Sequence, residues 1–78
     1  MPTILRAGPY RCFFCSGDRE EPPHIHVECD DHIAVLWLDP VRLQSSGGFN
    51  RREINRIRRL IEVNQQSVLE SWHECFDH

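Results

Sequence analysis

The stretch HIHVECDDHIAVLWLD, residues 24–39, decides the fold because it contains two strand-like segments joined by a short polar turn. Residues 24–29 alternate between polar and apolar side chains, which is the pattern of a strand with one buried face. Residues 32–39 are mostly apolar and rich in residues that favour strands. Since only Asp30 and Asp31 separate them, the two segments predict an antiparallel hairpin.

A two-residue turn sets which residues face each other across this hairpin. Counting back from the turn gives the pairs Cys29–His32, Glu28–Ile33, His26–Val35 and His24–Trp37. One face then carries the apolar set that a helix would cover: Ile25, Val27, Ala34, Leu36 and Leu38. The opposite face carries a mixed set: His24, His26, Glu28, Val35 and Trp37. A face of that composition is too apolar to be merely solvated and too polar to be plain core, which is typical of a binding surface.

Weaker strand and loop signals flank this hairpin. Residues 3–7 and 10–15 favour strands and are separated by a Gly-Pro pair, so they predict a second hairpin. Residues 40–49 are predicted to form a loop whose flexible point is the pair Gly47-Gly48. The sequence therefore predicts a small antiparallel sheet of about four strands.

A long helical segment follows the sheet. Asn50 is a good N-cap, and Glu53 three residues later completes a capping-box pattern. Apolar residues then recur on one arc of a helix: Ile54, Ile57, Leu60, Ile61, Val68, Trp72 and Cys75. The pattern predicts one helix over 51–75, and a bend or a break into two helices near Asn64 stays open. His73 falls on the outward side of this helix.

Together these elements predict an α+β fold in two layers, with the C-terminal helix packed on one face of the sheet. A chain of 78 residues predicts a single domain, 1–78. No apolar run reaches the length of a membrane span, and the N-terminus lacks the features of a signal peptide. The expectation is a cytoplasmic protein with no membrane partner.

The cysteines raise the question of a metal or redox site. They are Cys12, Cys15, Cys29 and Cys75. Cys12 and Cys15 form a C-x-x-C motif, but residues three apart on a strand point to opposite faces. A zinc site needs both thiolates to converge from a turn, and two phenylalanines stand between these. Buried free thiols are the favoured interpretation.

The His-x-His pair allows three interpretations. His24 and His26 could act as a recognition or acid–base pair on a phosphodiester, because imidazole titrates near neutral pH. As a weak alternative, they could bind a metal with Glu28 as the third ligand. They could also be structural residues, one of them stacked on Trp37. No cofactor is expected, and no metal is favoured.

The basic residues are concentrated in the predicted helix. All nine are arginines, and five of them lie within nine residues: Arg51, Arg52, Arg56, Arg58 and Arg59. Arg52, Arg56 and Arg59 lie together opposite the apolar arc. This face could be simply solvated, or it could bind nucleic-acid phosphates or the acidic surface of a protein. The net charge of −3 argues against indiscriminate coating of DNA.

A resemblance to a known family rests on several motifs. MPTILR…GPYRCFF, PPHIHV, WLDPVRL, GGF, REINRI and SWHECF resemble, in order and spacing, very short bacterial proteins catalogued as domain of unknown function 4160. The matching positions are Pro22, Pro23, His24, His26, Trp37, Asp39, Pro40 and Arg42. The resemblance implies a toxin-like member of a toxin–antitoxin pair with no established enzyme chemistry. The family has other residues at the cysteine positions, which also argues against a metal site there.

Two functional hypotheses follow. In the first, the protein is the toxin of a type II toxin–antitoxin module, acts on RNA or translation, and is neutralised by a small antitoxin-like protein encoded nearby. Arg52, Arg56 and Arg59 would then hold phosphates, His24 and His26 would contact or cleave the backbone, and Trp37 and Arg42 would contribute to binding. In the second, it is a non-catalytic regulatory module that binds protein or nucleic acid. Whether the protein is an enzyme, and which oligomeric state it adopts, stays open.

Overall fold

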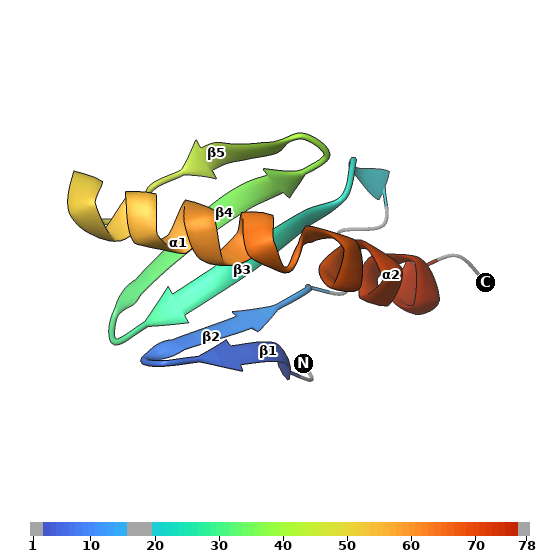
Figure 1. Cartoon of the computed structure of the whole chain (residues 1–78), viewed down its shortest axis with the longest axis horizontal. Coiled ribbons are helices and arrows are strands. Elements are labelled where there is room, and N and C mark those ends of the chain that lie inside the picture. Colours follow the sequence, from blue (N-terminus) through green and yellow to red (C-terminus); the bar gives the residue numbers. More distant parts are fainter. Residues whose placement is uncertain (1–2, 16–19, 77–78) are drawn as a thin grey trace.

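The computed structural model describes residues 3–15 and 20–76 (Figure 1). Its elements are β1 (Thr3–Ala7), β2 (Tyr10–Phe13), β3 (His24–Cys29), β4 (His32–Leu38), β5 (Val41–Ser45), α1 (Arg51–Val63) and α2 (Gln65–Phe76). The strands form one antiparallel sheet in the order β1-β2-β3-β4-β5, and both helices lie on the same face of it. The predicted α+β class with two layers is confirmed. Neither helix is long and apolar enough to cross a bilayer.

The central hairpin has the predicted register. β3 and β4 pair as Cys29–His32, Glu28–Ile33, His26–Val35 and His24–Trp37. Asp30 takes a left-handed backbone conformation with φ of 54°, which a short polar residue tolerates better than most. The side chains that alternate onto the helix-covered face are buried, as expected: Ile25, Val27, Ala34, Leu36 and Leu38. The turn length and the period of two were therefore sufficient to specify the pairing.

The sheet has five strands, not four. Residues 41–45, which the sequence assigns to a loop, form β5 and pair with β4 after a two-residue turn at Asp39-Pro40. The prediction missed β5 because this edge strand buries almost no side chain, so its sequence carries no strong apolar alternation. Its backbone pairing with β4 holds it in place.

The helical segment is two helices. The Asn50 side chain accepts a hydrogen bond from the Glu53 backbone N–H at 2.9 Å, which confirms the predicted N-cap. At the other end of α1, the Asn64 side chain donates to the Leu60 carbonyl at 2.8 Å, and α2 begins at the next residue. Gln65 then donates to the backbone carbonyl of Leu38 at 2.6 Å. This bond attaches the bend to the end of β4, so tertiary contact settles the alternative that the sequence left open.

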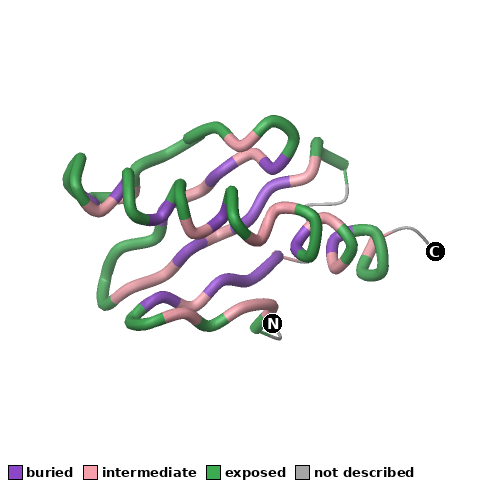
Figure 2. Tube along the Cα trace, in the orientation of Figure 1, coloured by how far each residue is buried: buried purple, intermediate pink, exposed green. Residues whose placement is uncertain are grey.

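The core lies between the sheet and the helices (Figure 2). Five residues of the predicted apolar arc are buried in it: Ile54, Ile57, Ile61, Val68 and Trp72. Cys75, predicted on the same arc, is instead exposed. The last turn of α2 packs Phe76 against Trp72, with ring centroids 4.4 Å apart, because residues four apart meet on one side of a helix.

The Gly47-Gly48 pair is a close crossing of the chain, not a flexible point. Gly47 has φ of +58°, and a Cβ there would overlap the backbone carbonyl oxygen of Ile33. Gly48 has φ of +95°, and a Cβ there would overlap the His32 ring. Only glycine satisfies both the left-handed backbone and the lack of space. The loop from β5 to α1 is therefore held tightly against the start of β4.

Candidate functional site

The sheet face that the helices leave uncovered, here called the outer face, carries the His-x-His pair. The register of β2 with β3 places Phe13 beside His26 and Arg11 beside Glu28. β4 adds Val35 and Trp37 to the same face. These outer-face side chains are mostly half-buried even though no helix covers them, because they pack against one another.

His26 is built into an aromatic stack. Its ring lies parallel to that of Phe13, with centroids 5.2 Å apart and an interplanar angle of 14°. The Cys15 Sγ lies 3.7 Å from His26 Nε2 and 3.8 Å from Nδ1. The ring stays half-exposed. His26 is therefore the member of the pair that solvent or a ligand can reach.

His24 occupies a different environment. Only 3% of its surface is exposed, and its Nδ1 donates a hydrogen bond to the Pro22 carbonyl at 2.9 Å. Its ring centroid lies 5.5 Å from that of Trp37 and 5.3 Å from that of Trp72 on α2. The register keeps His24 on the predicted face, with its ring centroid 5.5 Å from that of His26, but Trp72 of α2 also covers the ring. The ring packs as a core residue, and its burial limits its access to a substrate.

Glu28 forms an ion pair with Arg11. The Arg11 guanidinium lies 2.8 Å from Glu28 Oε1, and its Nε donates to the same oxygen at 2.9 Å. Arg11 also lies over the Phe13 ring, 4.6 Å from its centroid. Among residues 3–15 and 20–76, no three His, Cys, Asp or Glu side chains are grouped closely enough to hold a metal ion. The geometry does not bring His24, His26 and Glu28 together as ligands.

The cysteines do not converge either. Cys12 is buried on the helix-covered face, and burial raises the pKa of its thiol to about 11. Cys15 lies beside His26, so the two thiols of the C-x-x-C motif point to opposite faces, as predicted. Cys29 is half-buried, and desolvation followed by the charges of Asp30 and Glu53 raises its pKa. All four thiols are free, but only Cys12 is fully buried, so the expectation of buried thiols is wrong for the other three.

The predicted arginine face of α1 is present. Arg52, Arg56 and Arg59 are exposed and, with Asn55, border a shallow hollow of about 230 Å³ on the helix surface. Ile54, Ile57 and Ile61 of the same helix face the sheet, so these arginines point away from it. The outer face lies on the other side of the sheet. The structure therefore separates His26 from these three arginines by both layers of the molecule.

Arg42 lies with the outer-face residues and not with the helix arginines. It is exposed on β5 and pairs in register with Trp37. The sequence reasoning identified both residues but missed Phe13 and Cys15, which lie beside His26. The register of β2 with β3 places Phe13 opposite His26, and Cys15 follows two residues later. No signal within either segment specifies that pairing.

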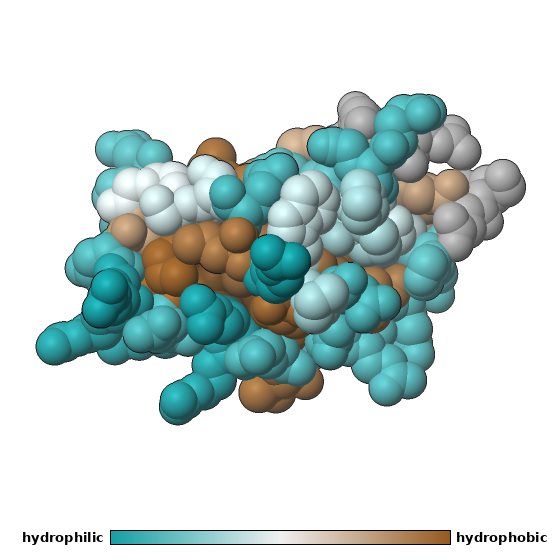
Figure 3. Space-filling model, turned by 90° about the horizontal axis from the view of Figure 1, so that it is seen from above, coloured by the Kyte–Doolittle hydropathy of each residue, from teal (hydrophilic) through white to brown (hydrophobic). Residues whose placement is uncertain are grey.

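A second group that the sequence reasoning missed lies between α1 and β5. Arg51 and Arg58 line a groove there together with Leu43, Phe49 and Ile54. Figure 3 looks onto the side of the molecule that carries β5 and shows apolar surface bordered by hydrophilic side chains.

Comparison with known proteins bears on family membership alone. The family model described as Domain of unknown function (DUF4160) matches residues 10–73, which is most of the chain. No curated protein and no solved structure gives a match. The chain therefore belongs to the DUF4160 family.

Proposed function

We propose that the protein is a toxin-like bacterial component that binds RNA through the arginine face of α1, formed by Arg52, Arg56 and Arg59. The observation that carries the proposal is the alignment of these three exposed guanidinium groups around one hollow. They follow one another by about 6 Å and about 4.5 Å along the helix axis. Each can therefore contact a separate phosphate of one strand.

The electrostatics of α1 favour a binding role over a purely solvated face. Within the described residues, the arginines of α1 make no ion pair; the one found there joins Arg11 to Glu28. Arg51 and Arg52 stand in the first turn, where the helix macrodipole disfavours cations. Arg52 and Arg56 are four residues apart, a spacing at which like charges repel. An arrangement that costs stability is expected when the charges serve an anionic ligand.

The geometry favours binding without cleavage. An RNA strand held on the arginine face would lie on the far side of the sheet from His26, and His24 is buried. In this mechanism the protein binds RNA that translation requires and thereby inhibits translation. A small antitoxin-like protein relieves the inhibition by covering the arginine face of α1. The toxin hypothesis is kept, but RNA binding replaces RNA cleavage as the cause of toxicity.

A growth experiment separates binding from cleavage. Expression of the chain alone in a bacterium should slow growth, and co-expression of the small protein encoded beside it should restore growth. Arg52→Gln/Arg56→Gln/Arg59→Gln should abolish the effect, whereas His26→Ala should retain it. Relief by His26→Ala with full activity of the triple variant would assign the function to the outer face. Normal growth at high soluble expression of the unmodified chain would refute the toxin role in that host.

RNA binding can be measured directly with a short fluorescent single-stranded RNA oligonucleotide. The logarithm of affinity should fall linearly with the logarithm of salt concentration, by about 0.7 for each phosphate contacted. Arg52→Gln/Arg56→Gln should reduce that slope by about 1.4. Arg51→Gln/Arg58→Gln removes the same charge from the same helix and should leave the slope nearly unchanged. Equal slopes for both double variants would show that only the overall charge matters.

A further inference from the structure

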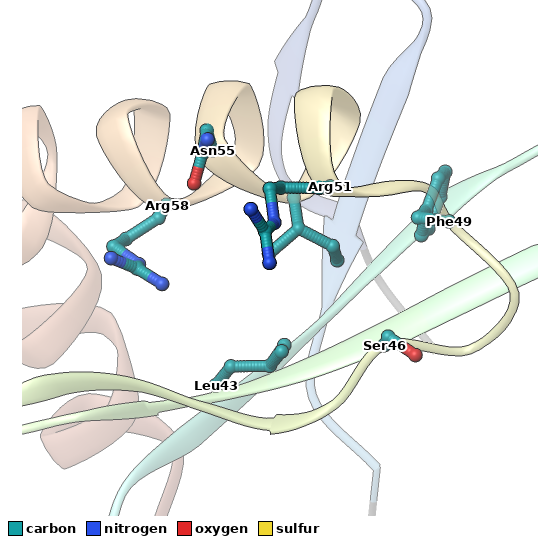
Figure 4. Close-up of a pocket in the computed structure, with 7 residues that line it drawn as sticks. Leu43, Ser46, Phe49, Arg51, Asn55 and Arg58 are labelled. Carbon is teal, nitrogen blue, oxygen red and sulfur yellow. The ribbon is translucent and has the colours of Figure 1, made fainter.

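The groove between α1 and β5, here called the α1–β5 groove, has an apolar floor. It measures about 330 Å³ and is formed by β5, the first half of α1 and the loop between them (Figure 4). Leu43 pairs in register with the core residue Leu36, so it lies on the helix-covered face of the sheet. Even so, 38% of its surface is exposed, because α1 passes beside it without covering it. Phe49 and Ile54 continue this apolar surface into the core.

Two arginines stand along the helix side of this groove. Arg51 and Arg58 are two helical turns apart, about 10.5 Å along the axis. Figure 4 shows both side chains extending from α1 into the space above Leu43. Neither forms an ion pair or hydrogen bond within the described residues, in contrast to Arg11, whose charge Glu28 balances. Two uncompensated cations beside exposed apolar surface are a site for carboxylates attached to an apolar group.

β5 supplies the third feature of the groove. It is the last strand of the sheet and pairs only with β4, so its second edge has no strand partner in the described part of the chain. Such an edge presents backbone N–H and C=O groups that an added strand can pair with. A nucleic acid could use the arginines but lacks the repeating backbone N–H and C=O groups that extend a sheet. The combination therefore favours a peptide over RNA.

We propose that the α1–β5 groove binds an extended acidic peptide segment of a partner protein, which adds to the sheet as a strand beside β5. In a strand, residues i, i+2 and i+4 point to one face and span about 13 Å. A segment with acidic residues at i and i+4 and an apolar residue at i+2 places the carboxylates at Arg51 and Arg58. Its apolar side chain then covers Leu43. The site goes beyond RNA binding, since it uses a different flank of α1.

The probe for this site is a short synthetic peptide with the core Glu-Thr-Val-Thr-Glu and a fluorescent label, titrated against the full chain by anisotropy. Arg51→Gln/Arg58→Gln should weaken binding by about tenfold or more, because each carboxylate loses a charge-assisted hydrogen bond. Arg52→Gln/Arg56→Gln is the matched control with the same loss of charge, and it should change the affinity by less than about twofold. Circular dichroism verifies that both variants fold.

Two further arms test the mode of binding. A peptide with proline at the central position cannot donate a backbone hydrogen bond and should bind much more weakly if a strand forms. Amide protons on the outer edge of β5 should also become protected from exchange when the acidic peptide binds. A Lys-for-Glu peptide should not bind. Equal losses in the two double variants, binding of the Lys peptide, or no binding at millimolar peptide would overturn the proposal.

The same double variants distinguish a failure of the peptide-binding proposal from a failure of the RNA-binding proposal. Loss of peptide binding in Arg51→Gln/Arg58→Gln with RNA binding intact supports two separate sites. If the RNA oligonucleotide displaces the peptide and both double variants weaken both ligands, α1 has a single polyanion site and this proposal fails. Failure of RNA binding alone would leave the peptide site standing.

Discussion

The outer face of the sheet and the exposed flanks of α1 both carry polar side chains that could bind a ligand. The two regions differ in whether those side chains have partners inside the protein. On the outer face, Arg11 is paired with Glu28, His26 is stacked on Phe13, and His24 is buried with its Nδ1 bonded to a carbonyl. On α1, five arginines are exposed, and none has an ion-pair partner within the described residues. Polar groups satisfied inside the protein hold the fold together, whereas uncompensated ones remain available to a partner.

The largest expected effect concerns the loop between β5 and α1, which positions the exposed flanks of α1. Gly47→Ala should destabilise the protein by about 3 kcal/mol or more, because the new Cβ must displace the Ile33 backbone. Gly8→Ala is the matched control: its φ is also +58°, but nothing lies within 4 Å of the added Cβ, so only the backbone strain of about 1 kcal/mol applies. Urea unfolding measures both values. Similar losses would mean that the loop adapts and does not hold the α1–β5 groove in shape.

His24→Ala tests whether the outer-face histidine is structural. Loss of a buried ring that contacts Trp37 and Trp72 should cost about 2–3 kcal/mol in the free energy of unfolding. Arg52→Gln, on the exposed side of α1, should change it by less than about 0.5 kcal/mol. Chemical denaturation of both variants gives the comparison. A negligible effect of His24→Ala would return that histidine to the set of functional candidates.

The stability of the protein at alkaline pH should depend on the thiol of Cys12, which is buried on the helix-covered face of the sheet. Burial raises the folded-state pKa of Cys12 from 9.0 to about 11, so the folded protein keeps the proton longer than the unfolded chain does. The contribution of the Cys12 thiol to the free energy of unfolding is fully present below pH 9. It falls by about 2 kcal/mol as the pH rises toward 11. Cys12→Ala should remove that part of the pH dependence, measured by thermal unfolding between pH 8 and 11. If the stability of the unmodified protein and of Cys12→Ala falls equally with pH, other groups control the pH dependence.

The smallest effects compare charges on the two regions. Glu28→Gln should destabilise the protein by about 0.5–1 kcal/mol, since it breaks a half-exposed ion pair. Arg56→Gln should have no effect or stabilise by a few tenths of a kcal/mol, because it relieves repulsion from Arg52. Differential scanning calorimetry should show a lower melting temperature for Glu28→Gln and an unchanged or slightly higher one for Arg56→Gln, with both effects smaller at high salt. A clear loss of stability in Arg56→Gln would mean that α1's arginines serve the fold.

Local patterns carried most of the fold but only part of the candidate site. The alternation and turn length of residues 24–39 predicted the β3–β4 register, and Asn50 predicted the start of α1, because both depend on neighbours in sequence. They did not predict β5, which has little apolar pattern and depends on pairing with β4. The α1–β5 groove was missed for the same reason.

What the sequence by itself determined is the α+β class, the central hairpin and the arginine face of α1, since period and spacing specify those features. What only the tertiary structure decided is which chemical groups meet. The passage of α2 around the end of the sheet buries His24 against Trp72. The packing of α1 on one face of the sheet places its arginines far from His26. Both outcomes depend on contacts between residues far apart in the chain, and no local periodicity specifies such contacts.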